Sequence, residues 1–216
     1  MNKTEKRERI AAVNAALKEL YPDECALLWG GDDPWRLLVM ARLSAQCTDA
    51  RVNLVTPVLF GRYPTPEALA AADVEEVESI VHSCGFFRQK AKDIVASAGQ
   101  IVAVYGGKVP DTIEALTALP GVGRKTANLI VGDIYGKPAV VADTHLIRIS
   151  NRLGLVATKD PYKVEMELRG LLPPGESNDY CHRNVLHGRA VCDARKPRCE
   201  ACVLRPVCDH AAQNDN

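Results

Sequence analysis

The sequence lacks several features that would place a protein in a class by composition alone. It has 27 Lys and Arg residues against 27 Asp and Glu residues, so there is no overall basic excess of the kind that accompanies nucleic-acid binding. No uncharged stretch is long enough to span a membrane, and no apolar run follows the basic residues near the N-terminus. We therefore expect a cytoplasmic protein without a membrane segment.

Strand signals, repeats and low-complexity segments are also nearly absent. Only residues 139–141 (AVV) suggest a strand, and three residues between Pro138 and Asp143 are too few to build a sheet. No repeat of solenoid period occurs, and the polar tail over 213–216 is the one biased segment. With 47% apolar and 25% charged residues in 216 positions, the composition excludes a disordered or fibrous chain and indicates a globular one.

The remaining pattern is helical almost throughout. Ile10, Val13, Leu17 and Leu20 recur at three- and four-residue spacing, which is typical of a helix that buries one stripe. Asp33-Pro34 is a helix-start signal before an apolar run over 35–45, and such a helix belongs in the middle of a core. Further helices are expected from start signals at Thr65 and Asp73 and over 88–105, 111–118, 124–135, 144–153, 161–171 and 177–191. The sequence therefore predicts an all-α fold.

Residues 119–127 (LPGVGRKTA) join a short helix to a longer one through Gly121 and Gly123. Glycines allow the backbone amides of such a turn to approach an anion closely, and a phosphate of a DNA backbone is the anion that fits. A tight helix–helix turn that needs glycine for steric reasons is the alternative. Lys125 follows in the first turn of the second helix. The positive end of the helix dipole disfavours a charged lysine there, and the neutral amine is the nucleophilic form.

Asp143 stands between the apolar run over 139–141 and a new helix. Aspartate at this position commonly caps a helix and stabilises it by about 1 kcal/mol. A capping carboxylate could also stabilise positive charge that develops on a sugar or accept a proton from an attacking group. Both roles remain open from the sequence alone.

Four of the eight cysteines lie within 17 residues, with the spacing Cys192-x6-Cys199-x2-Cys202-x5-Cys208. Cytosolic thiols stay reduced, so this set indicates a metal site rather than disulfides. Four thiolates suit a tetrahedral zinc or a four-iron cluster, and the spacing does not choose between them. Six basic residues against two acidic ones between Cys181 and Arg205 form either a DNA-facing patch or a solvated surface.

Taken together, these motifs resemble the endonuclease III family from about Trp35 to Cys208. The shared segments are 43–49 (LSAQCTD), 119–127 (LPGVGRKTA), 141–145 (VADTH) and 186–189 (LHGR) before the cysteine set. The resemblance implies a two-domain helix-hairpin-helix DNA glycosylase fold, a six-helix domain plus an iron–sulfur cluster domain. The expected ranges are 26–137 for the six-helix domain, about 112–132 for its hairpin, 1–25 and 138–216 for the discontinuous domain, and 192–208 for the cluster loop.

The same resemblance implies residue roles. Lys125 is expected to be the nucleophile, Asp143 the essential carboxylate, and Cys192, Cys199, Cys202 and Cys208 the ligands of a [4Fe–4S] cluster. The expected DNA contacts are Gln46, Phe86, Gly121, Val122, Gly123, Arg124, Thr126 and His145. Gln46 would fill the space left by a flipped nucleotide, and Phe86 lies where the family often has a leucine wedge.

The implied activity is base excision repair by a bifunctional N-glycosylase that removes oxidised or ring-saturated pyrimidines and cleaves the abasic strand through a lysine Schiff base. Its partner would be double-stranded DNA with damaged bases or abasic sites, and the protein would be a monomer. A mismatch-directed adenine or thymine glycosylase is one alternative, but the adenine branch carries a glutamate where this chain has Arg42. A non-catalytic helix-hairpin-helix module with a structural zinc is the other.

Overall fold

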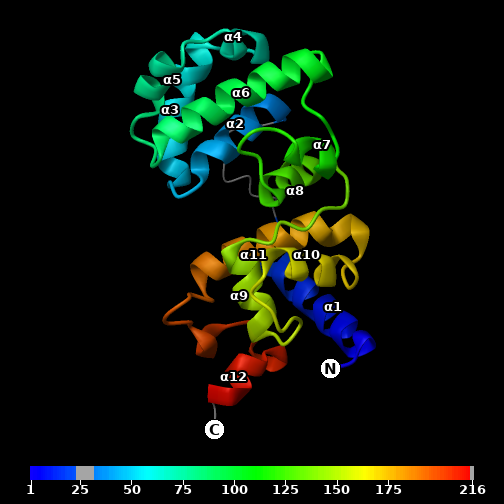
Figure 1. Ribbon diagram of the computed structural model, residues 1–216. Helices are drawn as coiled ribbons and strands as arrows, with labels where there is room; N and C mark the ends of the chain where they lie inside the picture. Colours follow the sequence, from blue (N-terminus) through cyan, green and yellow to red (C-terminus); the bar gives the residue numbers. More distant parts are fainter. Residues whose placement is uncertain (23–31, 215–216) are drawn as a thin grey trace. The chain divides into compact units, whose positions relative to one another are not determined.

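The computed structural model describes residues 1–22 and 32–214, and the chain divides into two compact units. The central unit comprises Ala26–Gly136, and the terminal unit comprises Met1–Cys25 together with Lys137–Asn216. Within the described residues all regular structure is helical, which confirms the predicted all-α fold (Figure 1). The predicted boundary between residues 25 and 26 lies outside the described residues. No helix in the described ranges is long and apolar enough to cross a membrane.

The central unit is built around one short, almost entirely apolar helix. Its helices are α2 (Pro34–Ser44), α3 (Asp49–Arg62), α4 (Pro66–Ala70), α5 (Val74–Val81), α6 (Phe87–Tyr105), α7 (Ile113–Thr117) and α8 (Arg124–Asp133). Asp33 caps α2 by accepting a hydrogen bond from the backbone N–H of Trp35 at 2.9 Å, and Pro34 takes the first helical position. Seven of the eleven α2 residues are buried, because α2 packs against α3, α6 and α8. This confirms the predicted core helix.

Helix α6 lies along α4 and α5 and carries the predicted stripe (Figure 1). Ala91, Ile94, Ala98 and Ile101 are buried at three- and four-residue spacing. The helix ends at Gly106, whose φ of +60° places it in the left-handed region that favours glycine. Two polar side chains of α6, Asp93 and Ser97, are also buried and support the hairpin between α7 and α8.

The terminal unit brings the N-terminal helix against the C-terminal third of the chain. Its elements are α1 (Lys3–Leu20), α9 (Thr144–Arg152), α10 (Pro161–Arg169), η1 (Pro174–Glu176), α11 (Ser177–Ala190), η2 (Cys199–Ala201), η3 (Arg205–Val207) and α12 (Asp209–Asn214). Helix α11 packs against both α1 and α9. Ile10, Val13 and Leu17 of α1 are buried as predicted, whereas Leu20 is exposed because it is the last residue of the helix.

Candidate functional site

The glycine hairpin connects α7 to α8 through a turn over 118–123. Gly121 has a φ of +71°, and Val122 is buried and donates its backbone N–H to the Leu119 carbonyl at 3.1 Å. Gly123 is the N-cap residue of α8 and provides no side-chain cap. A helix start without a side-chain cap offers its first amides to an external anion. The hairpin therefore has the form expected for gripping a phosphate.

Buried polar groups support the turn from within the central unit. Asp93 of α6 accepts hydrogen bonds from Arg42 of α2, one of them from Nε at 2.9 Å, and the pair lies directly under Gly121. Ser97, also on α6, donates its hydroxyl to the Pro120 carbonyl at 2.7 Å. A Cβ added at Gly121 would stand 2.5 Å from Arg42 Nε and 2.6 Å from Asp93 Oδ2. Glycine is required at this turn for its φ and for this close approach.

This packing predicts different effects at the two glycines. Gly121→Ala should lower the free energy of unfolding by about 2–4 kcal/mol, because the methyl group overlaps the Arg42–Asp93 pair at a positive φ. Gly123→Ala meets no atom within 4 Å and should leave stability nearly unchanged. Thermal or urea unfolding of both variants measures the difference. Equal stability of Gly121→Ala and the unsubstituted protein would contradict this description of the turn.

Lys125 is the second residue of α8 and its side chain is exposed. Arg124 and Thr126 on either side are half-buried, while Ala127 and Asn128 turn into the core. The amine is therefore presented on the outer face of the helix that follows the hairpin. The hairpin residues predicted from the sequence, Gly121 to Thr126, are together in one segment of the central unit, with Gly121, Gly123 and Lys125 exposed.

Gln46 and Phe86 form a second pair in the central unit. They are the two non-glycine residues with positive φ in the described part of the chain, at +53° and +58°. Gln46 is exposed after the end of α2, and Phe86 is 70% exposed at the start of α6. A Cβ at Gly85 would lie 3.2 Å from the Gln46 carbonyl oxygen, so the two loops touch. Backbone strain of this kind is concentrated at functional sites, and no residue pattern in the sequence indicates it.

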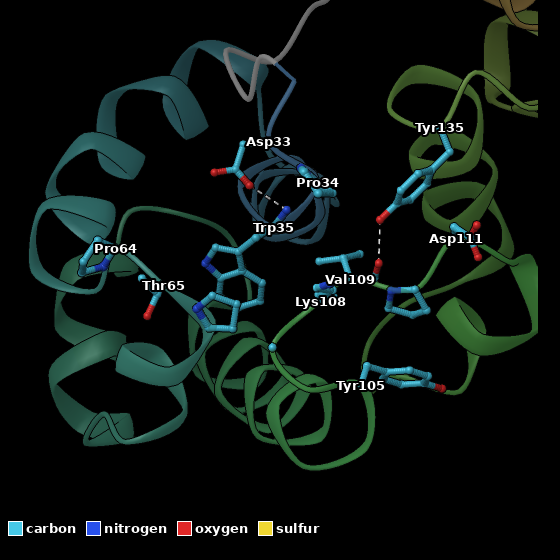
Figure 2. Close-up of a pocket in the computed structure, with 13 residues that line it drawn as sticks. Asp33, Pro34, Trp35, Pro64, Thr65, Tyr105, Lys108, Val109, Asp111 and Tyr135 are labelled. Atoms are coloured by element: carbon cyan, nitrogen blue, oxygen red, sulfur yellow. Dashed lines mark hydrogen bonds between the residues drawn. The ribbon is translucent and has the colours of Figure 1, made fainter.

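A cavity of about 770 Å³ also opens in the central unit (Figure 2). Trp35, Tyr105 and Tyr135 line it together with prolines, and the Tyr135 hydroxyl donates to the Val109 carbonyl at 2.5 Å. None of the predicted site residues lines this cavity. The predicted site residues of the central unit lie instead on the hairpin and on the two loops that carry Gln46 and Phe86.

Asp143 is half-buried at the start of α9 in the terminal unit. Its Oδ1 accepts a hydrogen bond from the backbone N–H of Leu146 at 2.7 Å, so the capping role is present. Its Oδ2 accepts no hydrogen bond from the described residues of its own unit, which leaves one carboxylate oxygen available. A single carboxylate therefore caps the helix and presents an acceptor.

His145 lies one residue beyond the cap and is fixed from α9 and α11. Its Nδ1 lies 3.1 Å from Arg148 Nη2, and Arg148 also donates to the Gly188 carbonyl at 3.1 Å. Burial lowers the pKa of the imidazole; the Asp143 carboxylate acts in the opposite direction and the Arg148 guanidinium adds to the lowering. A Cβ at Gly188 would collide with the ring, so glycine is needed there to seat His145.

The four clustered cysteines lie after α11 in one loop, and all four are half-buried. Burial raises the pKa of the Cys202 and Cys208 thiols, and charge on Cys192 and Cys199 raises it further, so the four sulfurs lie within electrostatic range of one another. Within residues 1–22 and 32–214, no group of three or more His, Cys, Asp or Glu side chains is arranged to hold a metal ion.

Donors from α9 and α11 reach this cysteine loop. Arg152 Nη1 donates to Cys192 Sγ at 3.1 Å, and Arg148 Nη2 donates to the Cys192 carbonyl at 2.8 Å. His187 Nε2 lies 3.3 Å from Cys202 Sγ. Ring or guanidinium nitrogens lie beside two of the four sulfurs, those of Cys192 and Cys202, and four cysteine thiols are the donor set of a four-iron cluster.

The local basic excess before and within the loop is only partly at the surface. Arg183 is buried and pairs with Asp179 at 3.1 Å, so it cannot belong to a DNA-facing patch. The exposed members are Arg189, Arg195, Lys196 and Arg198.

Comparison with known proteins identifies the family. Residues 39–174 match the HhH-GPD superfamily of base excision DNA repair proteins. Endonuclease III of Synechocystis sp. is 46% identical over 208 residues, which cover 95% of this chain and 94% of that protein. The chain belongs to the endonuclease III family. Endonuclease III of Bacillus subtilis is 41% identical over 91% of this chain and 90% of that protein.

The fold agrees with that of solved members of the endonuclease III family. The structure of a trapped endonuclease III–DNA covalent intermediate is 36% identical and has a TM-score of 0.90, with 100% of both chains covered. Membership of the family makes this chain an enzyme of base excision DNA repair, a DNA glycosylase and lyase. The family, fold and enzyme class expected from the sequence motifs are thereby confirmed.

Proposed function

We propose that this chain removes oxidised or ring-saturated pyrimidines from duplex DNA and then cleaves the abasic strand by β-elimination. The observation that carries the proposal is the exposed Lys125, held on the first turn of α8 directly behind the glycine hairpin. A hairpin that grips the DNA backbone brings a nucleophile on the next residues close to a sugar. The protein would act as a monomer on chromosomal DNA in the cytoplasm.

Binding and extrusion of the damaged nucleotide are assigned to the central unit. The amides at Gly121 to Arg124 would hold a phosphate without reading sequence. Flipping a nucleotide out of the stack costs a few kcal/mol, and side chains that fill the vacated space offset part of it. Gln46 and Phe86, exposed on two touching loops, are the residues proposed to do so. An aromatic ring at Phe86 would wedge between bases where the family often has leucine.

The chemistry is assigned to Lys125 and Asp143. The neutral Lys125 amine attacks the sugar C1′, and the glycosidic bond breaks as the base leaves with its electron pair and a proton. Asp143 stabilises the positive charge that develops on the sugar and accepts a proton from the attacking amine. The C1′–O4′ bond of the lysine adduct then breaks, O4′ takes up a proton and the imine forms. The imine acidifies the C2′ position, and loss of that proton expels the 3′ phosphate. Strand cleavage therefore follows from the same covalent attachment.

A duplex with a single thymine glycol tests the substrate class against a duplex with adenine opposite 8-oxoguanine. We expect base release and strand cleavage on the first duplex and little release on the second. Arg42 supports this choice, because its guanidinium is held by Asp93 at the position where the adenine branch carries a glutamate. Robust adenine release would overturn the proposed specificity. An abasic duplex left uncut would favour a non-catalytic binding module.

We also propose that Cys192, Cys199, Cys202 and Cys208 hold a [4Fe–4S] cluster. When bound, such a cluster links four points of the cysteine loop and so stabilises the surface that carries the exposed basic residues. The side chains of Arg152 and His187 reach two of the four sulfurs, and donors of this kind stabilise thiolate ligands.

Protein purified anaerobically should be yellow-brown and contain about four irons per chain. Cys199→Ala should lose the iron and impair folding of the loop, whereas Cys47→Ser, a half-buried cysteine of the central unit, should keep it. Iron analysis and visible absorbance measure both. Stoichiometric zinc without iron would contradict the proposed cluster and support the zinc alternative.

A further inference from the structure

Two cysteines outside the cysteine loop lie together in the central unit. Cys84 is fully buried and Cys47 is half-buried, both are free thiols, and they interact electrostatically with each other. Cys47 directly follows Gln46, and Cys84 precedes Gly85 and Phe86. The thiol pair therefore lies at the base of the two strained loops described above.

The surrounding contacts hold this arrangement in place. The 3.2 Å approach of a Gly85 Cβ position to the Gln46 carbonyl fixes the backbone beside each cysteine. Lys90 is buried, donates from Nζ to the Leu43 carbonyl at 2.7 Å, and lies within electrostatic range of both thiols. The charge on Lys90 opposes the rise that burial causes in the pKa of the Cys84 thiol.

We propose that Cys47 and Cys84 form a reversible dithiol site, which a peroxide closes to a disulfide that ties the Gln46 loop to the Phe86 loop. Disulfide formation requires two cysteines on segments that lie close together, and the backbones of Gln46 and Gly85, next to Cys47 and Cys84, are in contact. The site is separate from the four cysteines of the C-terminal loop and has no part in the lyase chemistry.

The reaction balances with one peroxide per pair. The Cys47 thiolate attacks a peroxide oxygen, breaks the O–O bond, becomes a sulfenic acid and releases water after proton uptake. The Cys84 sulfur then attacks the Cys47 sulfur, forms the S–S bond and expels a second water. Cys47 is half-buried whereas Cys84 is fully buried, so a peroxide reaches Cys47 first and Cys84 resolves the sulfenic acid.

The consequence of the disulfide rests on the proposed function of Gln46 and Phe86. Both residues flank the bond by one or two positions, so a covalent link restricts how far the two side chains can separate when DNA is bound. Misplacement of positioning groups by about 1 Å can cost up to about a hundredfold in rate. The oxidised protein should therefore process a lesion more slowly than the reduced protein.

The test treats the holoprotein with hydrogen peroxide, blocks the remaining thiols and maps tryptic peptides. A disulfide would join peptides 43–51 and 63–88, with a mass lower by two hydrogens than their sum. The rate of thymine-glycol release should fall at least about fivefold and recover with dithiothreitol. Cys84→Ala keeps the four C-terminal cysteines, so it reports peroxide damage to that loop. This variant should show neither the linked peptides nor a loss of rate that dithiothreitol reverses.

Absence of the linked peptides would overturn the proposal. Disulfide-linked protein that releases thymine glycol as fast as the dithiol form would also overturn it. Cys84→Ser serves as the second variant if the alanine variant does not fold. Reduced protein without activity on the lesion would count against the proposed function instead, because peptide mapping is independent of activity. Linked peptides with a recoverable loss confined to the unsubstituted protein would support the site.

Discussion

Lys125→Gln is expected to abolish the covalent protein–DNA adduct that borohydride traps during turnover. Borohydride reduces an imine to a stable amine, and glutamine cannot form that imine. Strand cleavage of an abasic duplex should fall by more than about a thousandfold, which corresponds to about 4 kcal/mol in the barrier. The exposed position of Lys125 means that the fold should not change. Denaturing gels of the trapped reaction measure the adduct.

The matched control for Lys125→Gln is Lys92→Gln, which also removes one exposed lysine from a helix of the central unit. The control should retain both the adduct and strand cleavage. DNA binding by Lys125→Gln should persist, because the hairpin amides and the other basic residues still contact phosphates. A trapped adduct formed by Lys125→Gln would show that another amine is the nucleophile, and Lys125 would then be a phosphate anchor.

Asp143→Asn is expected to reduce base release by about a hundredfold or more, equivalent to about 2.7 kcal/mol in the barrier. Asparagine caps a helix about as well as aspartate, so the hydrogen bond from the Leu146 N–H should persist. The free energy of unfolding should change by less than ~1 kcal/mol. The loss should therefore appear in turnover and not in stability, as measured by single-turnover kinetics and thermal unfolding.

Asp160→Asn provides a control of the same geometry. Asp160 caps α10 in the terminal unit, and its Oδ1 accepts a hydrogen bond from the Lys163 N–H at 2.8 Å. Its substitution should leave both stability and base release nearly unchanged. If Asp143→Asn behaves like Asp160→Asn, Asp143 is a helix cap without a role in base release.

Much of the helical architecture follows from the sequence because start signals and apolar spacing agree there. Asp33-Pro34 and the stripe from Ala91 to Ile101 are examples in which capping and burial point to the same helix. Helix α3 (Asp49–Arg62) was not predicted. Pro57 and Gly61 both disfavour a helix interior, yet Val52, Leu59 and Phe60 are buried, so tertiary packing outweighs local propensity.

Features that depend on tertiary contacts could also not be predicted from the sequence. The strained backbone at Gln46 and Phe86 arises from loop packing, and no residue pattern signals it because neither position is glycine. Arg183 is one of the six basic residues between Cys181 and Arg205, but contacts with Asp179 and the Tyr21 carbonyl bury it. The Arg42–Asp93 pair under Gly121 joins residues 51 positions apart, a separation at which sequence spacing carries no information.

The motifs, by contrast, could be recognised in the sequence because their conformation or chemistry requires particular residue types. Positive φ and close approach require glycine at Gly121, and a helix start favours aspartate at Asp143. These local demands locate the candidate residues within each unit.

Identification of the trapped residue is the most direct test of the mechanism. The unsubstituted protein would be reacted with a thymine-glycol duplex in the presence of borohydride, and the adduct would be digested and sequenced by mass spectrometry. We expect one modified residue, Lys125, with tryptic cleavage blocked after it. Base release with no adduct, or an adduct on any other lysine or on the N-terminal amine, would contradict the proposed mechanism.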